Sequence, residues 1–169
     1  RVLFRSTYSF WFKRSASGNY PVFFGNGSDS NNRNSFFINQ ASGNYIEFYC
    51  LSGGSIIVDL ATTQVFRDYS AWYHIVLAVD TTQATSTNRI KMYINGSQIT
   101  SFSTATYMSQ NTDMITNSTN PFRVGGDNTT SAYFDGYLAD YYFIDGQALD
   151  PSYFGQSNSS GVWTPIPYR

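Results

Sequence analysis

Carboxyl side chains are the first candidates for chemistry, because glycoside hydrolysis requires two carboxyl groups flanking the scissile bond. Glu47 is the only glutamate, and its segment, residues 45–51, contains no second acidic residue. Asp140 and Asp145 lie five positions apart and would face opposite sides of an extended strand. No catalytic pair lies along one strand, so the sequence favours a domain that is not an enzyme. The alternative is a hydrolase whose catalytic pair is formed by two aspartates from different strands.

Histidine and cysteine occur once each. His74 is the only histidine, and no G-x-S-x-G motif supplies it with a nucleophile. We therefore expect a strand histidine that is hydrogen-bonded at the face of a sheet. Cys50 is the only cysteine, so no internal disulfide can form, and a buried thiol is expected.

Aromatic side chains offer a second kind of chemistry, since sugars stack their apolar faces on exposed rings and accept hydrogen bonds from neighbouring polar groups. Strand alternation places Trp11, Tyr93, Tyr141 and Phe143 beside or opposite core-facing neighbours. These four residues are the candidates for binding a glycan. The alternative is that most of them pack the sheet.

Short strands must position these residues. Residues 7–14 alternate Phe10 and Phe12 with Trp11, which is the period of two of a strand. Further strands are predicted at 20–24, 35–38, 45–51, 55–60, 71–80, 89–96, 122–126 and 133–144. The stretch 25–35 is expected to be a polar loop, and 147–154 is the one segment with helical character. The shared core is predicted to contain Phe10, Phe12, Ile75, Leu77, Val79, Met92 and Ile94.

Length and composition limit the class of protein. A chain of 169 residues fits a single domain, 1–169. Charged residues are only 12% and aromatic residues 18%, while the net charge is -1, with no basic run for a nucleic acid partner. No apolar stretch is long enough for membrane insertion.

Three segments carry a family resemblance. Trp72-Tyr-His-Ile-Val-Leu-Ala-Val-Asp80 and Lys91-Met-Tyr-Ile-Asn-Gly96 resemble the paired "W-H-H-V…D" and "L-Y-V-D-G" strands of laminin-G-like, concanavalin A-like lectin/glucanase domains. Residues 134–149 are similar to their closing strand, usually "F-x-G-x-I-D…A-L". The resemblance implies an all-β, concanavalin A-like jelly-roll sandwich of two antiparallel sheets. Glucanases of this fold carry an E-x-D-x-x-E strand, which this sequence lacks.

The resemblance also suggests a calcium site. Laminin-G-like domains often bind Ca²⁺ through rim loops that supply Asp or Asn side chains and backbone carbonyl oxygens as ligands. Asp127 and Asn128, which follow Gly125-Gly126, are the nearest match to such a loop. Residues 26–32 are an oxygen-rich alternative without the spacing of a known calcium loop. Ca²⁺ is the one cofactor that we expect, if any is bound.

Segments 9–15, 80–85 and 143–149 are also similar to lectin-like domains in structural proteins of marine bacteriophages. This resemblance implies a non-catalytic piece of a longer virion protein at the virion surface, in a tail fibre, spike or capsid decoration. Its partners would be cell-surface carbohydrate and other virion proteins, and a homo-oligomer, preferably a trimer, is expected. The alternatives are a polysaccharide-degrading glycoside hydrolase and a purely structural scaffold.

Overall fold

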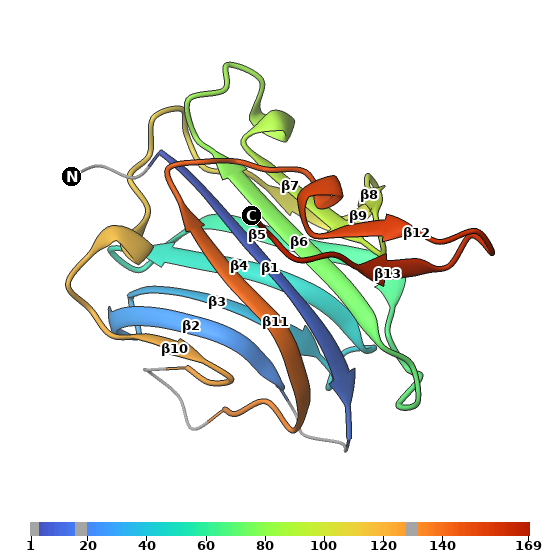
Figure 1. Cartoon of the computed structure of the whole chain (residues 1–169). Coiled ribbons are helices and arrows are strands. Elements are labelled where there is room, and N and C mark those ends of the chain that lie inside the picture. Colours follow the sequence, from blue (N-terminus) through green and yellow to red (C-terminus); the bar gives the residue numbers. More distant parts are fainter. Residues whose placement is uncertain (1–3, 16–19, 128–131) are drawn as a thin grey trace.

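The computed structural model describes residues 4–15, 20–127 and 132–169, and the regular secondary structure of this part of the chain consists almost entirely of strands (Figure 1). Three single turns of 3-10 helix interrupt them: Ser86–Asn88, Ile115–Asn117 and η3, Pro151–Tyr153. The helical character expected over 147–154 is therefore limited to η3. The predicted all-β class is confirmed.

Two large antiparallel sheets lie face to face (Figure 1). In spatial order, the five-stranded sheet contains β11 (Gly136–Asp145), β1 (Arg5–Arg14), β6 (Tyr73–Asp80), β7 (Ile90–Ile94) and β8 (Ser97–Ile99). The six-stranded sheet contains β10 (Phe122–Val124), β2 (Val22–Asp29), β3 (Asn32–Asn39), β4 (Tyr45–Ser52), β5 (Ser55–Val65) and β9 (Phe102–Thr106). A small hairpin, β12 (Gly155–Ser157) and β13 (Trp163–Pro165), forms a separate sheet.

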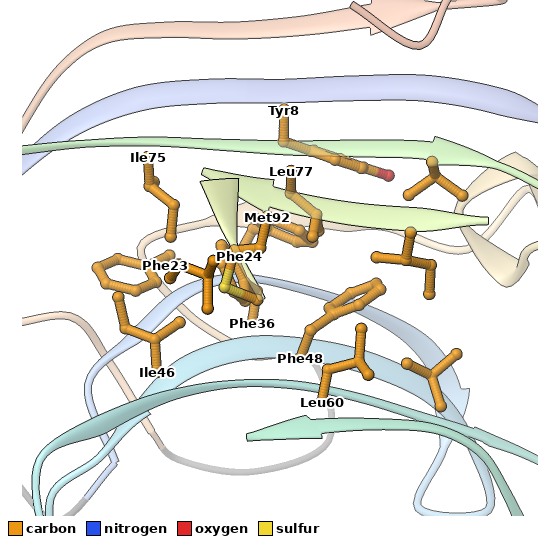
Figure 2. Packing of buried hydrophobic residues seen from close by; sticks show 14 of the residues in the cluster. Tyr8, Phe23, Phe24, Phe36, Ile46, Phe48, Leu60, Ile75, Leu77 and Met92 are labelled. Carbon is orange, nitrogen blue, oxygen red and sulfur yellow. The ribbon is translucent and has the colours of Figure 1, made fainter. Parts of the chain in front are cut away.

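The core lies between the two sheets (Figure 2). All seven side chains predicted for it are at most 5% exposed, so strand alternation gave the correct inward face for β1, β6 and β7. Aromatic rings join the layers: Tyr8 of β1 stacks on Phe24 of β2 with ring centroids 4.4 Å apart. Cys50 is buried in the same cluster and is not part of a disulfide.

The polar stretch 25–35 is not a loop, which corrects the expectation from its composition. β2 and β3 run through it and leave only a tight turn, because Asp29 Oδ1 accepts hydrogen bonds from the backbone N–H groups of Asn31 and Asn32. Asn26 and Asn34 point inward and are fully buried, yet their amides donate to partners on the 116–121 segment. Polar residues therefore extend these strands instead of ending them.

A β-bulge changes the phase of β11. Ser9 of β1 lies opposite Tyr142, but Trp11 lies opposite Ala139, so two residues of β11 oppose one residue of β1. Asp140 takes up the extra residue with a φ of 47°, a conformation that aspartate tolerates better than most residues. Beyond the bulge, residues with odd numbers face the core.

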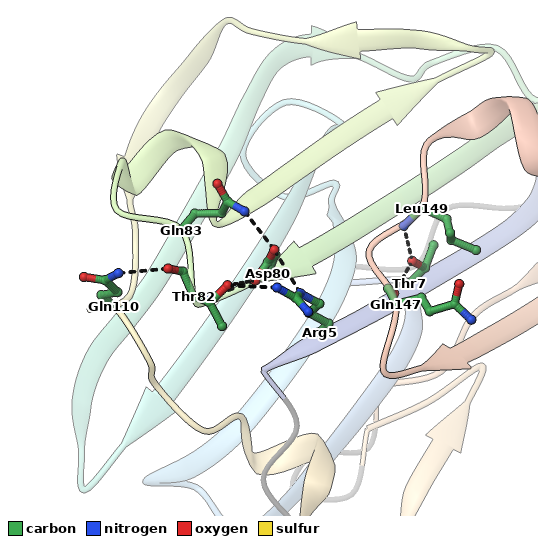
Figure 3. A network of polar contacts seen from close by, with 8 residues as sticks. All are labelled: Arg5, Thr7, Asp80, Thr82, Gln83, Gln110, Gln147 and Leu149. Carbon is green, nitrogen blue, oxygen red and sulfur yellow. Dashed lines mark hydrogen bonds and ion pairs between the residues drawn. The ribbon is translucent and has the colours of Figure 1, made fainter.

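Polar contacts tie distant segments to β1 (Figure 3). Arg5 forms an ion pair with Asp80 at 3.1 Å, and the other oxygen of that carboxylate accepts from the hydroxyl of Thr82. Thr7 donates to the carbonyl of Gln147 and accepts from the N–H of Leu149, both over 2.8 Å. The two Thr7 contacts hold the chain after β11 against the outer face of the five-stranded sheet.

The C-terminal hairpin covers that same outer face. Trp163 packs so closely on Gly96 and Gly155 that a Cβ atom at either glycine would lie 2.5 Å from the indole ring. Val76, Leu149 and Phe154 form a small second core beneath the hairpin. The part of the chain that the structure describes contains no helix that is long and apolar enough to cross a membrane.

Candidate functional site

The outer face of the six-stranded sheet carries side chains that the core does not use. Phe36 and Ile38 of β3 point inward, so Ser35 and Phe37 point outward. On β4 the same alternation turns residues 45, 47 and 49 outward. The register brings these residues together: Ser35 lies opposite Tyr49, and Phe37 lies opposite Glu47.

A pocket of about 380 Å³ opens on this face. Its lining comes from β2, β3, β4 and the two segments that approach them: Tyr20, Val22, Arg33, Ser35, Phe37, Asn39, Glu47, Tyr49, Asp127 and Ala132. The volume lies within the range of small-molecule sites in proteins, roughly 300–1,000 Å³. The lining combines aromatic rings with hydrogen-bonding groups.

The aromatic part of the pocket is formed by Tyr20, Phe37 and Tyr49. The ring of Tyr20 is 45% exposed and meets Phe37 edge-on, with centroids 5.9 Å apart. Phe37 and Tyr49 are partly exposed. Rings at different angles with open faces are suited to stacking against a flat, weakly polar surface.

One polar part is built around Asp127, which is 1% exposed. Its carboxylate accepts a hydrogen bond from the Ser35 hydroxyl and lies 3.5 Å from the guanidinium of Arg33. Gly25 makes this approach possible, since a Cβ atom there would lie 2.9 Å from the Asp127 Cα. The guanidinium of Arg33 also lies 5.9 Å from the ring centroid of Tyr49.

The second polar part contains Glu47, whose Oε2 accepts a hydrogen bond of 2.9 Å from the Asn39 amide. Burial raises the pKa of Glu47; the Asn39 hydrogen bond opposes this shift, and the charge of Asp59 adds to it. Asp59 lies opposite Tyr49 on β5, and burial raises its pKa as well. These carboxylates are partly desolvated acceptors at the surface of the sheet.

The structure separates the four predicted glycan residues. Trp11 and Tyr93 face the outer side of the five-stranded sheet, away from the pocket. Trp11 stacks on His74 with centroids 4.9 Å apart, and Tyr93 packs on the small second core. Tyr93 also lines a smaller recess of about 280 Å³ beside Lys91.

Tyr141 and Phe143 lie on the inward face, where Tyr141 stacks on Phe10 and Phe143 on Tyr8. Both point inward and not outward because the bulge at Asp140 shifts the alternation by one residue. Phe143, on the edge strand β11, is nevertheless 39% exposed. The four residues therefore do not form one surface. Whether any of them contacts a ligand stays a prediction.

Of the predicted calcium ligands, Asn128 lies outside the described residues. Asp127 is described, and its Oδ2 is engaged by Ser35 and Arg33. The alternative stretch, 26–32, is taken up by β2, β3 and their turn. Within residues 4–15, 20–127 and 132–169, no cluster of three or more His, Cys, Asp or Glu side chains is suited to a metal. Calcium stays a prediction.

His74 is a buried strand residue, as expected. Its Nε2 lies 2.9 Å from the hydroxyl of Ser9, and its Nδ1 accepts a hydrogen bond of 2.9 Å from Trp163. Because Nδ1 accepts, the ring proton resides on Nε2, which donates to Ser9. The imidazole cannot remove a proton from Ser9 in this state, so the pair is not a nucleophile and base.

Sequence reasoning missed Tyr20, Arg33, Phe37 and Tyr49. Phe37 and Tyr49 alternate with the buried Phe36 and Phe48, and that signal could have placed them on an outer face. Arg33 was missed because the polar composition of residues 25–35 indicated a loop and not a strand. The approach of Asp127 to β2 carries no local signal, because more than ninety residues of chain separate Asp127 from Arg33 and Ser35.

The fold and the pocket together define a lectin-like β-sandwich. The chain belongs to the concanavalin A-like lectin/glucanases superfamily, whose family model matches residues 5–152. No curated protein sequence matches it. Nothing in the matches bears on a bacteriophage or marine source.

Several solved structures share the fold at low identity. Domain 4 of AbnA, a GH43 extracellular arabinanase from Geobacillus stearothermophilus in complex with arabinotriose, has a TM-score of 0.62 and 21% identity over 90% of this chain and 65% of that chain. The CBM40 of a Ruminococcus gnavus IT-sialidase, bound to α2,3-sialyllactose, has a TM-score of 0.60 and 17% identity, with coverages of 89% and 80%. A point mutant of the NanB sialidase from Streptococcus pneumoniae has a TM-score of 0.60 and 16% identity, with coverages of 94% of this chain and 26% of that chain.

Proposed function

We propose that this domain binds glycans without cleaving them, through the pocket on the outer face of the six-stranded sheet. The observation that carries the proposal is the combination of Tyr20, Phe37 and Tyr49 with carboxylate and amide groups in one pocket of about 380 Å³. A sugar ring presents apolar C–H faces for stacking and a rim of hydroxyl groups for hydrogen bonds. The complexes of similar fold with arabinotriose and sialyllactose support this reading.

The test is a binding measurement on matched variants. The wild-type domain is screened on a glycan array, and the strongest hits are titrated by calorimetry. Tyr20→Ala removes a pocket ring and should weaken binding about fivefold or more. Tyr153→Ala, on η3, removes a ring that is 50% exposed, compared with 45% for Tyr20, and should leave affinity unchanged. Equal affinities for both variants, or no bound glycan at all, would reject the pocket as the site.

A glycoside hydrolase is the second candidate, because one observation favours it. Glu47 and Asp59, from neighbouring strands, lie close enough for the charge of one to raise the pKa of the other. Two carboxyls with different environments are the minimum for acid and base catalysis. Glu47 is, however, held by Asn39, and Asp59 is not part of the pocket lining, so binding without cleavage is the better supported function.

We further propose a setting at the surface of a virion, as a fibre, spike or decoration domain that forms a homo-oligomer, preferably a trimer. The support is the sequence resemblance together with exposed apolar side chains such as Val124, Tyr133 and Tyr137, which are at least 50% exposed. Light scattering on the full-length protein tests the assembly. A strict monomer at micromolar concentration would favour an independent lectin, and an oligomer without glycan binding would favour a scaffold.

A further inference from the structure

The charged residues of the pocket indicate which charge its ligand should have. Arg33 is the only cation among the described lining residues, and it already forms an ion pair with Asp127. Its guanidinium lies 3.5 Å from the carboxylate of Asp127, which is 1% exposed. The positive charge is therefore balanced within the protein.

The negative charges on the same face are not balanced in this way. Neither Glu47 nor Asp59 has a Lys, Arg or His of the described chain within ion-pair distance. The pocket lining thus holds one guanidinium and two carboxylates, those of Asp127 and Glu47, and Asp59 adds a negative charge beside the lining, opposite Tyr49. In a partly desolvated pocket, a further negative charge would be repelled much more strongly than in water.

The hydrogen-bonding pattern points in the same direction. Asn39 occupies Oε2 of Glu47, while no described residue donates to Oε1. A carboxylate oxygen in this state accepts hydrogen bonds from hydroxyl groups and offers nothing to another carboxylate or a sulfate. Similar folds do not decide the matter, since one is bound to arabinotriose and another to sialyllactose.

We propose that the pocket selects uncharged sugar residues and discriminates against glycans that carry a carboxylate or sulfate at the bound position. The inference rests on the glycan binding proposed above. Glu47 acts as the selecting residue: it accepts hydrogen bonds from sugar hydroxyl groups and repels anionic substituents. Arg33 and Asp127 hold the opposite wall of the pocket as a neutral pair.

Paired glycans test this inference. An array presents neutral oligosaccharides beside the same structures with one added sialic acid, uronic acid or sulfate, and the hits are titrated at low and high salt. Neutral members should bind at least about tenfold tighter than their acidic counterparts, and the difference should shrink as salt screens the repulsion. Equal or tighter binding of the acidic members through this pocket would overturn the inference.

A matched pair of variants assigns the effect to Glu47. Glu47→Gln keeps the size of the side chain and removes its charge, so the preference for neutral glycans should fall severalfold. Asp140→Asn removes one negative charge from an exposed position in the other sheet and should leave the preference unchanged. Binding of neither class would reject the proposed function itself, whereas an acidic preference would reject only this inference.

Discussion

The indole nitrogen of Trp163 donates a hydrogen bond of 2.9 Å to Nδ1 of His74, across 89 positions of the sequence. The imidazole contacts two indoles, with ring centroids 4.9 Å away for Trp11 and 6.0 Å away for Trp163. Burial lowers the pKa of His74 to about 4. Protonation would place an N–H at Nδ1, directly facing the N–H of Trp163.

Acidification should therefore destabilise the domain. The pKa of His74 is near 6.5 in the unfolded chain and about 4 in the folded one, so the unfolded state binds more protons between these values. The free energy of unfolding should fall by up to about 3 kcal/mol as the pH drops from 6.5 to 4. Urea denaturation at several pH values measures this slope. A His74→Gln variant should lose most of it, and an unchanged slope in that variant would contradict the prediction.

Truncation of a core residue should be costly. Ile75 is fully buried, so Ile75→Ala should lower the free energy of unfolding by about 2–5 kcal/mol. Ile56→Ala makes the same chemical change at a side chain that is 50% exposed and should cost about 1 kcal/mol or less. Equilibrium denaturation of the two variants checks the register of β6. Similar losses for both would mean that Ile75 is not part of the core.

Much of the fold could be predicted because the alternation of apolar and polar residues can be recognised within each strand by itself. Phe10 and Phe12, or Ile75 and Leu77, need only their neighbours to indicate which face they occupy. The bulge at Asp140 could not be predicted in this way, since its backbone conformation depends on the pairing with β1. That single extra residue turned Tyr141 and Phe143 from an expected outer face to the inward face of β11, where Tyr141 packs against the core and Phe143 stays 39% exposed.

The candidate site was less predictable than the fold. Its aromatic wall follows alternation on β3 and β4, but its polar wall depends on Asp127 meeting Ser35 and Arg33. Such a contact is decided by how β10 pairs with β2. The carboxylates of Glu47 and Asp59 were also missed as a pair, because adjacent strands bring them to one face while no single strand holds both.

Loss of the buried carboxylate at position 127 should leave a positive charge without its partner. Asp127→Asn should lower the free energy of unfolding by about 1–3 kcal/mol, because the Arg33 charge stays partly buried. Arg5→Gln breaks the ion pair with Asp80, in which the Arg5 side chain is 51% exposed, and should cost less than about 1 kcal/mol. Thermal denaturation compares the two. A smaller loss for Asp127→Asn would show that the pair contributes little.

The domain should not hydrolyse laminarin, agarose, alginate or peptidoglycan. Glu47 is held by Asn39, and no second carboxylate lines the pocket on the strand that carries Glu47. A reducing-sugar assay with the purified domain tests this expectation. Sugar release that disappears in Glu47→Gln would establish the hydrolase instead.

Calcium, if the rim loop with Asp127 and Asn128 binds it, should raise the melting temperature by mass action. The comparison is between millimolar calcium and a chelator, with magnesium as the control cation. Because Arg33 lies 3.5 Å from the Asp127 carboxylate, Arg33→Gln should strengthen any calcium effect that exists. A melting temperature that is the same in calcium and chelator would remove the site.

The covered outer face of the five-stranded sheet determines in which direction the pocket of a tethered domain faces. The C-terminal hairpin lies over that sheet (Figure 1). The pocket opens on the outer face of the other sheet, on the far side of the sandwich. A domain tethered through Arg169, on a sensor surface or in a fusion, would thus hold its pocket toward the solution. Several copies anchored in this orientation would engage a glycan-coated surface together, and their avidity would exceed the affinity of one pocket.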